Sequence, residues 1–457
     1  MKIVLIRPSP SPETIGLQHV MICEPLELEY LCSAIADLGH ETVIMDMILE
    51  SDPVEVILRA QKPDVVGITG YISHVGVVRD ICRAAKRLSP GCRTVVGGVH
   101  AEVVPLDFVD PAVDFIVAAN PLTTFRQLVE ALGAGGSTDA IPGLWREGAP
   151  QCARETTFTH PWPDRSKVAR YRSRYYYLFH NPCALMKTSF GCPHDCSFCF
   201  CREVTGGTYF KRDLDDVIAE LASLPEEDVY LVDDDFLVSR ERVLAFCRGV
   251  QAAGLHKRFL IYGRADFIAA NEDVIAEFRQ AGLRAVIVGL ESCRADELKQ
   301  MNKRTDVATN EAAVRVLARH GVDCYATLIL GLDWGTADFD RLGDWLRGLG
   351  LVFVNLQPFT PLPGTGLYEQ YHDRLVVPRE EYDQWDLAHL VVAPTRLSTT
   401  EYYRQILKLY RRITLRPAVL WQLARKHGVW ANLRLLSGAR RVARQYERRA
   451  KAGEGTP

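Results

Sequence analysis

Long hydrophobic runs are absent from this sequence of 457 residues. No stretch approaches the roughly eighteen consecutive apolar residues that a membrane-spanning helix needs, so we expect no segment that spans a membrane. The apolar run within residues 1–7 is too short for a secretory signal and predicts a first strand instead. Gly/Ser-rich linkers, low-complexity tracts and short repeats are also missing, so nothing indicates a repeat architecture.

A disulfide framework is not indicated either. The thirteen cysteines are odd in number and scattered through a long chain, whereas disulfide-rich domains are short and have paired cysteines. We therefore expect reduced thiols and a cytoplasmic protein. The length exceeds that of one ordinary domain, and a hydrophobic content of 47% is enough for two or three cores.

Acidic residues are scarce at the carboxyl end. Downstream of Glu401 there are roughly fourteen Lys or Arg but only two Glu, although the whole chain has a net charge of −3. Residues 433–449 mix basic and apolar side chains, a pattern typical of helices that lie on an anionic membrane surface. A solvated helix packed on its own domain explains the pattern equally well. Nucleic acid is another partner of basic tails, but the acidic remainder of the chain argues against it.

The most informative motif is a run of three cysteines, Cys192, Cys196 and Cys199, spaced Cys-x3-Cys-x2-Cys. Three thiolates can hold three corners of a [4Fe–4S] cluster and leave one iron open to a small molecule. The alternatives are a structural zinc site with Cys201 as fourth ligand, or unrelated buried thiols. Zinc loops usually supply their ligands in two separated pairs, which this loop does not. Cys183 and Cys201 flank the motif, and each is either a catalytic thiol or an inert one.

Strand and helix signals alternate over residues 1–141. Short β-branched runs at 3–6, 42–45, 65–69, 94–96 and 115–117 are separated by helical stretches. This alternation predicts an α/β fold with a parallel, doubly wound sheet that binds its ligand at the carboxyl ends of the strands. The loops expected there, 69–74 and 97–101, contain small residues that allow a large flat ligand to approach the backbone.

After a linker rich in Pro and aromatics (142–182), residues 183–385 return to the same rhythm. Six predicted strands separated by helices suit an open, partial (β/α) barrel, and residues 386–457 predict a helical cap with a basic tail. At the strand ends, Asp233 and Asp234 could bind an ammonium group, or they could form a solvated turn or helix cap. Arg264 could pair with a carboxylate and Glu291 could accept hydrogen bonds from a ribose, or the two could form an internal ion pair.

Taken in order, these motifs resemble the radical S-adenosylmethionine (SAM) enzymes that carry a cobalamin (vitamin B12) binding domain. The matching residues are the cysteine triplet with Phe198, Gly97-Gly98, Gly-Leu-Glu-Ser at 289–292 and Pro-Leu-Pro-Gly-Thr at 361–365. The resemblance implies an N-terminal Rossmann-like B12-binding domain, a partial (β/α)6 radical SAM barrel and a C-terminal helical extension. Two features depart from the family. The loop after the first strand lacks Asp-x-His-x-x-Gly, and residues 118–121 replace a common Gly-Glu-Gly-Glu.

The resemblance also implies three cofactors and their contacts. Cys192, Cys196 and Cys199 would hold a [4Fe–4S] cluster. SAM would lie against Phe198, Asp233, Asp234, Arg264, Glu291 and Pro363. Cobalamin would lie against Thr69, Gly70, Tyr71, Ser73, Gly97, Gly98 and His100, and His19 and His74 are further candidates for contact with it. No general acid or base is predicted.

The activity implied by the resemblance is reductive cleavage of SAM to a 5′-deoxyadenosyl radical, with methylation of an unactivated carbon of a small molecule. Residues 410–417 resemble a region of family members that act on lipids and tetrapyrroles, so we expect a hydrophobic substrate. Flavodoxin or ferredoxin would be the reductant, and the basic tail would contact a membrane peripherally. The alternatives are a non-methylating cyclisation or rearrangement enzyme, with or without cobalamin, and a non-enzymatic protein that binds an iron–sulfur cluster or a corrinoid.

Overall fold

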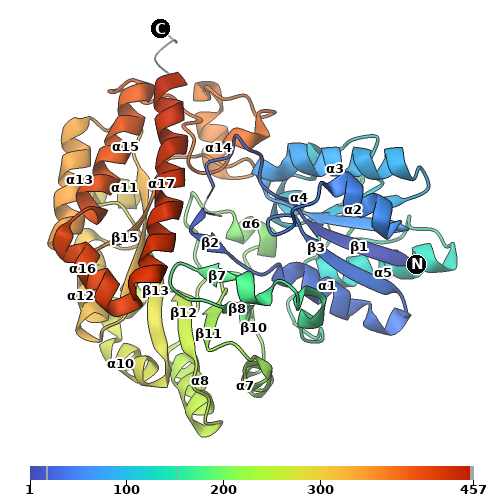
Figure 1. Ribbon diagram of the computed structural model, residues 1–457, viewed down its shortest axis with the longest axis horizontal. Coiled ribbons are helices and arrows are strands. Elements are labelled where there is room, and N and C mark those ends of the chain that lie inside the picture. The colour runs from blue at the N-terminus through green and yellow to red at the C-terminus, as the bar shows by residue number, and fades with distance from the viewer. Residues whose placement is uncertain (17–18, 151, 453–457) are drawn as a thin grey trace.

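The computed structural model describes residues 1–16, 19–150 and 152–452. Its amino-terminal third is a parallel sheet with strand order β3-β1-β4-β5-β6 (Figure 1). The strands are β1 (Lys2–Arg7), β3 (Glu41–Asp46), β4 (Val65–Thr69), β5 (Arg93–Gly97) and β6 (Phe115–Ile116). Helices α1 (Leu26–Ala34) and α5 (Pro121–Ala134) cover one face, α2 (Val54–Gln61) and α3 (Val75–Leu88) cover the other, and the short α4 (Val99–Val103) follows β5. The predicted doubly wound sheet is confirmed.

Strand β1 shows why this sequence forms such a sheet. Ile3, Val4, Leu5 and Ile6 are all fully buried, because helices cover both faces and side chains on either side must be apolar. The strand order reverses direction between β1 and β4. At such a switch point the loops leave the sheet on opposite faces and open a crevice at the carboxyl ends of the strands.

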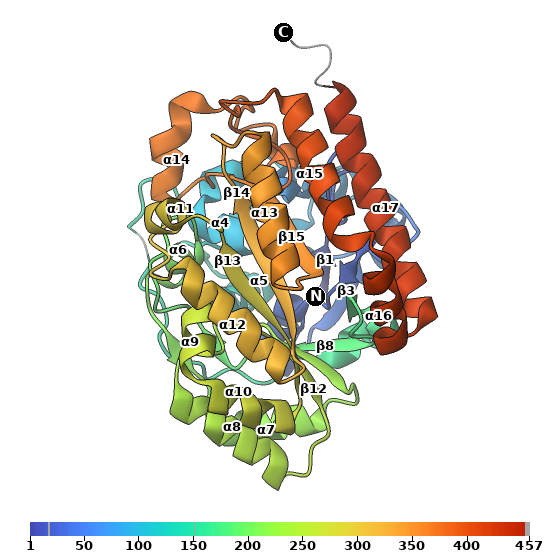
Figure 2. The same ribbon diagram turned by 90° about the vertical axis from the view of Figure 1, so that its left-hand side faces the viewer.

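The second sheet has six parallel strands in the order β15-β14-β13-β12-β11-β8. They are β8 (Cys183–Met186), β11 (Asp228–Leu231), β12 (Arg258–Tyr262), β13 (Leu283–Glu291), β14 (Asp323–Leu330) and β15 (Phe353–Pro358). Its outer helices are α7 (Leu214–Ser223), α8 (Arg240–Ala252), α10 (Glu272–Ala281), α12 (Val307–Arg319) and α13 (Thr336–Gly348) (Figure 2). Strands β8 and β15 do not pair with each other. The predicted partial barrel is therefore confirmed, with one open edge.

Shorter elements decorate the strand ends and connections. Helices α6 (Cys201–Thr205), α9 (Ala265–Ala270), α11 (Ala295–Gln300) and α14 (Gly366–Tyr371) follow barrel strands, β9 (Ser189–Phe190) pairs with β10 (Phe210–Lys211), and β2 (Met21–Ile22) pairs with β7 (Tyr176–Tyr177). The β2–β7 pair ties the first domain to the segment that leads into the barrel.

Three helices close the chain: α15 (Thr399–Thr414), α16 (Pro417–His427) and α17 (Val429–Ala452). Helix α17 packs along α15, and its first turns lie over the open edge of the barrel (Figures 1 and 2). There the ring of His427 stacks on Phe179 with 3.8 Å between centroids, and the Arg434 guanidinium lies 4.2 Å from the Tyr176 ring centroid. Within the described residues, no helix combines the length and the apolarity needed to cross a membrane.

Candidate active site between the two sheets

The three cysteines of the motif lie on one loop between β9 and α6. The antiparallel pair of β9 and β10 brackets this loop at its base. Gly191, just before Cys192, has a φ of +79°, and a Cβ there would lie 2.0 Å from the Thr208 carbonyl oxygen. Only glycine fits this turn, which is closed from the barrel side by a 3.0 Å hydrogen bond from Gly191 N–H to Asp234.

The surroundings of the loop fit an anionic iron–sulfur cluster. Arg264 Nη1 lies 3.8 Å from Cys196 Sγ, and the buried ammonium of Lys303 is also near this thiol. Burial raises the pKa of Cys196, and the two cations act against that rise. Next to Cys199, a hydrogen bond from the Cys201 thiol lowers the pKa of the Cys199 thiol. Positive charge and donors beside thiolates stabilise the ionised form that binds iron.

The spacing of these thiols differs from that of a single-ion site. Among the residues described by the structure, no three His, Cys, Asp or Glu side chains converge closely enough to hold one metal ion. The ligands of a [4Fe–4S] cluster bind different irons and do not need that convergence. The donor set available to a cluster is therefore Cys192, Cys196 and Cys199, three thiols on one loop.

The two aspartates after β11 have different surroundings. Asp233 is buried and accepts hydrogen bonds from Thr188 N–H (2.6 Å), Thr188 Oγ1 (2.5 Å) and Ser189 Oγ (2.7 Å). These bonds anchor the strand that enters the cluster loop and use the lone pairs of Asp233. Asp234 is only partly buried and faces the loop, with Lys187 Nζ at 3.7 Å. Of the two, Asp234 is the one that can bind an incoming ammonium group.

One alternative predicted an ion pair between Arg264 and Glu291. The structure does not show this pair, because each of the two side chains has another partner. Arg264 pairs with Asp266, Nη2 to Oδ2 at 2.9 Å, and Glu291 accepts a 2.7 Å hydrogen bond from Lys303 Nζ. Glu291 has a φ of +58°, which is rare for a non-glycine residue and indicates a local constraint at the strand end. Sequence reasoning missed Lys303, because nothing in its spacing from Glu291 indicates a partner.

Of the other two expected SAM contacts, Phe198 lies beside Lys303 and Pro363 lies in the loop after β15. Lys303 Nζ lies 5.7 Å from the centroid of the Phe198 ring, so Phe198 and Glu291 share a neighbour. Pro363 is buried in the loop after β15. The next residue, Gly364, has a φ of +88°, and a Cβ there would lie 2.3 Å from Val103 of α4. This loop therefore packs directly against the first domain.

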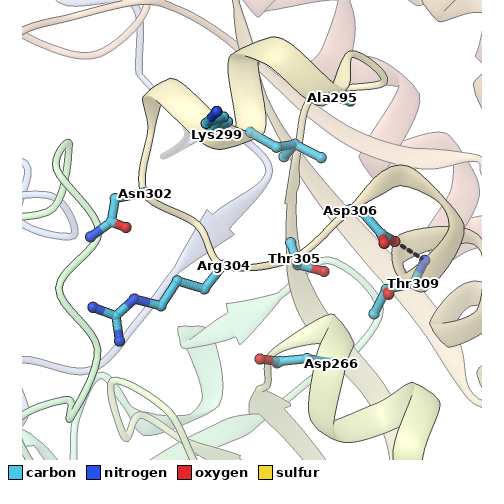
Figure 3. A pocket seen from close by; sticks show the side chains of 9 residues that line it. Asp266, Ala295, Lys299, Asn302, Arg304, Thr305, Asp306 and Thr309 are labelled. Atoms are coloured by element: carbon cyan, nitrogen blue, oxygen red, sulfur yellow. Dashed lines mark hydrogen bonds between the residues drawn. The ribbon is translucent and has the colours of Figure 1, made fainter.

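A hollow of about 500 Å³, lined in part by Asn302 and Arg304, adjoins the cluster loop at Asp195 (Figure 3). Arg304 donates to Asp195 Oδ2 at 2.6 Å, and Asn302 donates to the Asp195 carbonyl at 3.0 Å. On the other side of the hollow, Asp306 turns back and caps α12 through Thr309 N–H. Charged and polar side chains of this hollow thus contact the cluster loop at Asp195.

The predicted cobalamin loops meet at the carboxyl ends of β4 and β5. Gly98 has a φ of +104°, and a Cβ there would lie 2.8 Å from Thr69 Oγ1 and 2.9 Å from Gly70 N. The Gly-Gly loop can therefore pack against the loop of 69–74 only without a side chain at residue 98. Gly97 has no such restriction, since its Cβ would only touch Val117 at 3.7 Å. Ser73, which belongs to the first of these loops, is buried.

The three candidate histidines lie in different places. His100 is buried and bonded to Asp107, with Nε2 to Oδ2 at 2.8 Å, inside the first domain. His19 lies beside Arg441 on α17 and is not at the strand ends. His74 Nδ1 accepts a 3.2 Å hydrogen bond from Tyr71 N–H. In a neutral imidazole the proton is then on Nε2, which leaves no free lone pair for a metal.

A recess separates the strand ends of the two sheets. Tyr71 from the first domain is 57% exposed and Tyr262 at the end of β12 is 39% exposed. Burial nevertheless raises the pKa of both phenols. A side chain can be solvent-accessible and yet surrounded by protein when it lines a deep recess. Glu27 behaves in the same way, since burial raises the pKa of its solvent-accessible carboxyl group, which accepts a hydrogen bond from Thr69.

The recess continues into an aromatic barrel interior. Tyr230 of β11 contacts Tyr262 and Tyr177, with ring centroids 5.9 and 5.2 Å apart, and Tyr177 stacks on Tyr325 of β14 at 6.1 Å. Inward-facing residues of the remaining strands are apolar: Cys183, Leu185, Leu260, Ala285 and Ile287. Side chains alternate between the two faces of each strand, but the sequence does not show which face points into the barrel. Sequence reasoning therefore missed Tyr262 and Glu27.

Comparisons with known proteins agree with this geometry. Residues 14–129 match the family model described as B12 binding domain, and residues 186–346 match the model of the radical SAM superfamily. The chain is 28% identical to the hopanoid C-3 methylase of Methylococcus capsulatus, over 93% of this chain and 82% of the relative. It is 24% identical to an anaerobic magnesium-protoporphyrin IX monomethyl ester cyclase of Cereibacter sphaeroides, over 92% of this chain and 71% of the relative.

A solved structure has the same fold over nearly the whole chain. The radical SAM methyltransferase TsrM from Kitasatospora setae, with cobalamin and a [4Fe–4S] cluster bound, superposes with a TM-score of 0.70 at 18% identity and covers 98% of this chain and 99% of that one. Both domain models occur in the predicted order, and the recess lies between them. The chain belongs to the radical SAM enzymes that carry an N-terminal B12-binding domain.

Proposed function

We propose that this protein is a cobalamin-dependent radical SAM enzyme that methylates an unactivated carbon of a hydrophobic small molecule. The observation that carries the proposal is the recess, in which Tyr71 of the loop after β4 lies near Tyr262 of β12, and Tyr262 lies near Asp234 and Cys201 beside the cysteine loop. When bound, the cluster and SAM supply a 5′-deoxyadenosyl radical and cobalamin supplies a methyl group, and the protein supplies geometry and exclusion of water.

The chain's own residues take the following roles in this proposal. Cys192, Cys196 and Cys199 hold the cluster, while Lys303 and Arg264 balance its charge. Asp234 binds the SAM ammonium, and Asp233 positions the cluster loop through Thr188 and Ser189. Phe198, Arg264, Glu291 and Pro363 border SAM, and Thr69, Gly70, Tyr71, Ser73, Gly97 and Gly98 border cobalamin. His100, which is buried and bonded to Asp107, also belongs to the residues proposed to border cobalamin.

The hydrophobic substrate follows from the barrel interior. Tyr177, Tyr230 and Tyr325, together with the apolar strand residues, offer a surface that favours rings and alkyl groups over charged molecules. Two relatives are named after molecules of this kind, a hopanoid and a magnesium porphyrin. Because the second of these is a cyclase, ring closure without methyl transfer is the second candidate function.

Electron delivery belongs to the same proposal. A small reductant such as flavodoxin or ferredoxin would dock over the hollow beside Arg304 and Asn302, which adjoins the cluster loop at Asp195. A reducing cytoplasm suits such a protein, since all thirteen cysteines are free.

The test is a reaction of the anaerobically purified, cluster-reconstituted protein with hydroxocobalamin, dithionite and SAM, analysed by mass spectrometry. We expect formation of 5′-deoxyadenosine and retention of corrinoid, and we expect Cys196→Ala to abolish both the cluster absorbance and SAM cleavage. Cys247→Ala, a buried cysteine of α8, is the matched control and should keep the cluster.

The same reaction separates the two candidate functions. With SAM labelled as CD3 and with candidate lipids or tetrapyrroles added, methyl transfer gives a deuterated product and S-adenosylhomocysteine. Cyclisation gives 5′-deoxyadenosine and an unlabelled product. A reconstituted protein that has neither cluster absorbance nor SAM cleavage would rule out both enzymatic functions.

A further inference from the structure

We propose that the corner of α16 and α17 docks on an anionic phospholipid membrane. The feature that suggests this is a group of large apolar side chains without cover. Trp421 is 65% exposed, Trp430 is 85% exposed and Leu433 is 50% exposed. Leu415 and Val429, at 56% and 61%, extend the same group. Tryptophan with one polar edge and a large apolar face is the residue that prefers the boundary between lipid and water.

Along one face of α17, a row of cations follows this apolar group. Its exposed positions are Trp430, Leu433, Ser437, Arg440, Arg441, Arg444, Arg448 and Lys451, which follow one another at helical spacing. Within the described residues, Arg440, Arg441, Arg444, Arg448 and Lys451 form no ion pair with a carboxylate, although this protein pairs most of its other arginines. No acidic residue occurs in 402–446.

The cations of α17 also border a hollow of about 500 Å³, together with His19. Arg441, Arg444, Arg448 and Lys451 line it, and its one carboxylate, Glu447, is paired with Arg411 at 3.0 Å. A hollow with four cations and a neutralised acid fits the phosphate of a lipid headgroup. Near an anionic leaflet, each Lys or Arg strengthens binding by roughly a factor of five.

The position of this face explains what docking would achieve. The α16–α17 corner covers the open edge of the barrel, where His427 stacks on Phe179. From there aromatic contacts lead inward, since Phe179 contacts Phe353 at 5.5 Å and Phe353 contacts Tyr325 of the interior at 5.1 Å. Docking would place the apolar edge of the barrel against lipid. The inference stands on the exposed face alone and goes beyond the proposed function, but it suits a substrate that dissolves in membranes.

The occupant is a bilayer and not another protein because of the combination of side chains. Exposed tryptophans together with unpaired arginines suit the interfacial and the anionic headgroup regions of one leaflet. Arg425 lies 5.5 Å from the ring centroid of Trp421, which keeps a cation next to an interfacial aromatic side chain. The one carboxylate at the hollow, Glu447, is already paired with Arg411, so this face has no free acidic group for a basic protein partner.

The test is flotation of the full-length, reconstituted protein with vesicles of pure phosphatidylcholine or of phosphatidylcholine with about one-third phosphatidylglycerol. We expect binding to the anionic vesicles that is at least tenfold tighter than to the neutral ones and that weakens with added salt. Replacing Arg440, Arg441, Arg444 and Arg448 by Gln should lower the affinity at least tenfold, and Trp421→Ser with Trp430→Ser should do the same.

Matched controls change equally exposed residues elsewhere. Arg59, Lys62, Arg87 and Arg248, all exposed, are replaced by Gln as the charge control, and Val56→Ser with Leu106→Ser is the apolar control. Both should bind like wild type, and SAM cleavage in detergent-free buffer should be unchanged in every folded variant. The proposal is overturned if wild type does not float with anionic vesicles, if the controls lose as much affinity as the α17 variants, or if free inorganic phosphate alone abolishes binding at equal ionic strength.

Discussion

Asp233 and Asp234 are adjacent in the sequence, and the local pattern cannot distinguish them. The structure gives Asp233 three donors and a buried position, whereas Asp234 keeps an accessible oxygen next to the cluster loop. The same limit applies to Glu291, whose sequence context predicted a SAM contact but whose nearest partner is Lys303. The motifs thus predicted a candidate site, but pairing inside it depends on side chains from distant parts of the chain.

The two aspartates should respond differently to loss of charge. Asp234→Asn removes the carboxylate proposed to bind an ammonium group, so SAM affinity should fall by about 1.5–3 kcal/mol, or roughly tenfold to a hundredfold. Asp233→Asn presents an amide to Thr188 and Ser189 donors and should lower the free energy of unfolding by about 2–4 kcal/mol. Calorimetric titration of SAM and urea unfolding measure the two effects. A larger loss of SAM affinity in folded Asp233→Asn than in Asp234→Asn would reverse the assignment.

Gly98 offers a second prediction for a single residue. Gly98→Ala needs a positive φ and places its Cβ within 3.0 Å of Thr69 and Gly70 atoms, so it should destabilise the first domain by about 1–3 kcal/mol. Gly91→Ala is the control, because no atom lies within 4 Å of its Cβ position. Its free energy of unfolding should stay within about 0.5 kcal/mol of wild type. Urea unfolding of the cofactor-free protein measures both, and equal stability of the two variants would contradict the close approach of the loops.

At the scale of elements, sequence patterns were most informative. The helical stretches predicted in the first 141 residues and the six strands of the barrel are confirmed, because β-branched runs and helical periodicity are local properties. The order of strands in each sheet was not predicted, since it depends on which strands pair. The β2–β7 pair joins Met21 to Tyr177, and two residues per strand give no detectable pattern. Short helices such as α9 and α11 were not predicted either, because they too have few residues to form a pattern.

Helix α1 carries a buried carboxyl group whose contribution to the free energy of unfolding depends on pH. Glu29 is fully buried and neither of its carboxylate oxygens has a hydrogen-bond partner. Burial, and secondarily the neighbouring Glu24, raise the pKa of Glu29 well above its usual value. The folded state therefore holds a proton that the unfolded state releases at lower pH. The stability this proton contributes is complete below the unfolded pKa and is lost as the pH rises through the folded pKa.

Glu29→Gln should remove this dependence. At about pH 5 the variant and the wild type should have similar free energies of unfolding, and at about pH 9 the variant should be more stable by about 1–3 kcal/mol. Glu147→Gln, at an exposed position, is the control and should follow wild type at both values. Urea unfolding at the two pH values measures the difference. A variant that is less stable than wild type at the higher pH would show that ionised Glu29 has favourable partners.

The whole molecule is held together by contacts that join its first residues to its last third. Asp107 of the first domain accepts from Arg379 at 2.7 Å, and Ser11 donates to Asp383 at 2.8 Å. The Ile15 N–H donates to Asp386 at 2.6 Å. These pairs are separated by more than 270 residues, so no local pattern predicts them. They fix the distance between the two sets of strand ends and hence the shape of the recess.

These contacts predict that the cofactor-free protein unfolds in one calorimetric transition, because neither domain can unfold without breaking the hydrogen bonds and the ion pair that join it to the other. Cobalamin lying between the domains should then raise the midpoint of that single transition. At a free concentration about a hundredfold above its dissociation constant, the gain is about 2.7 kcal/mol, or a few degrees for a chain of this size. Arg379→Met should lower the midpoint or split the transition, whereas Arg374→Met, whose guanidinium lies over Tyr371 in the same segment, should not. Two transitions in the wild type, with cobalamin shifting only the first, would mean that the recess is built by one domain alone.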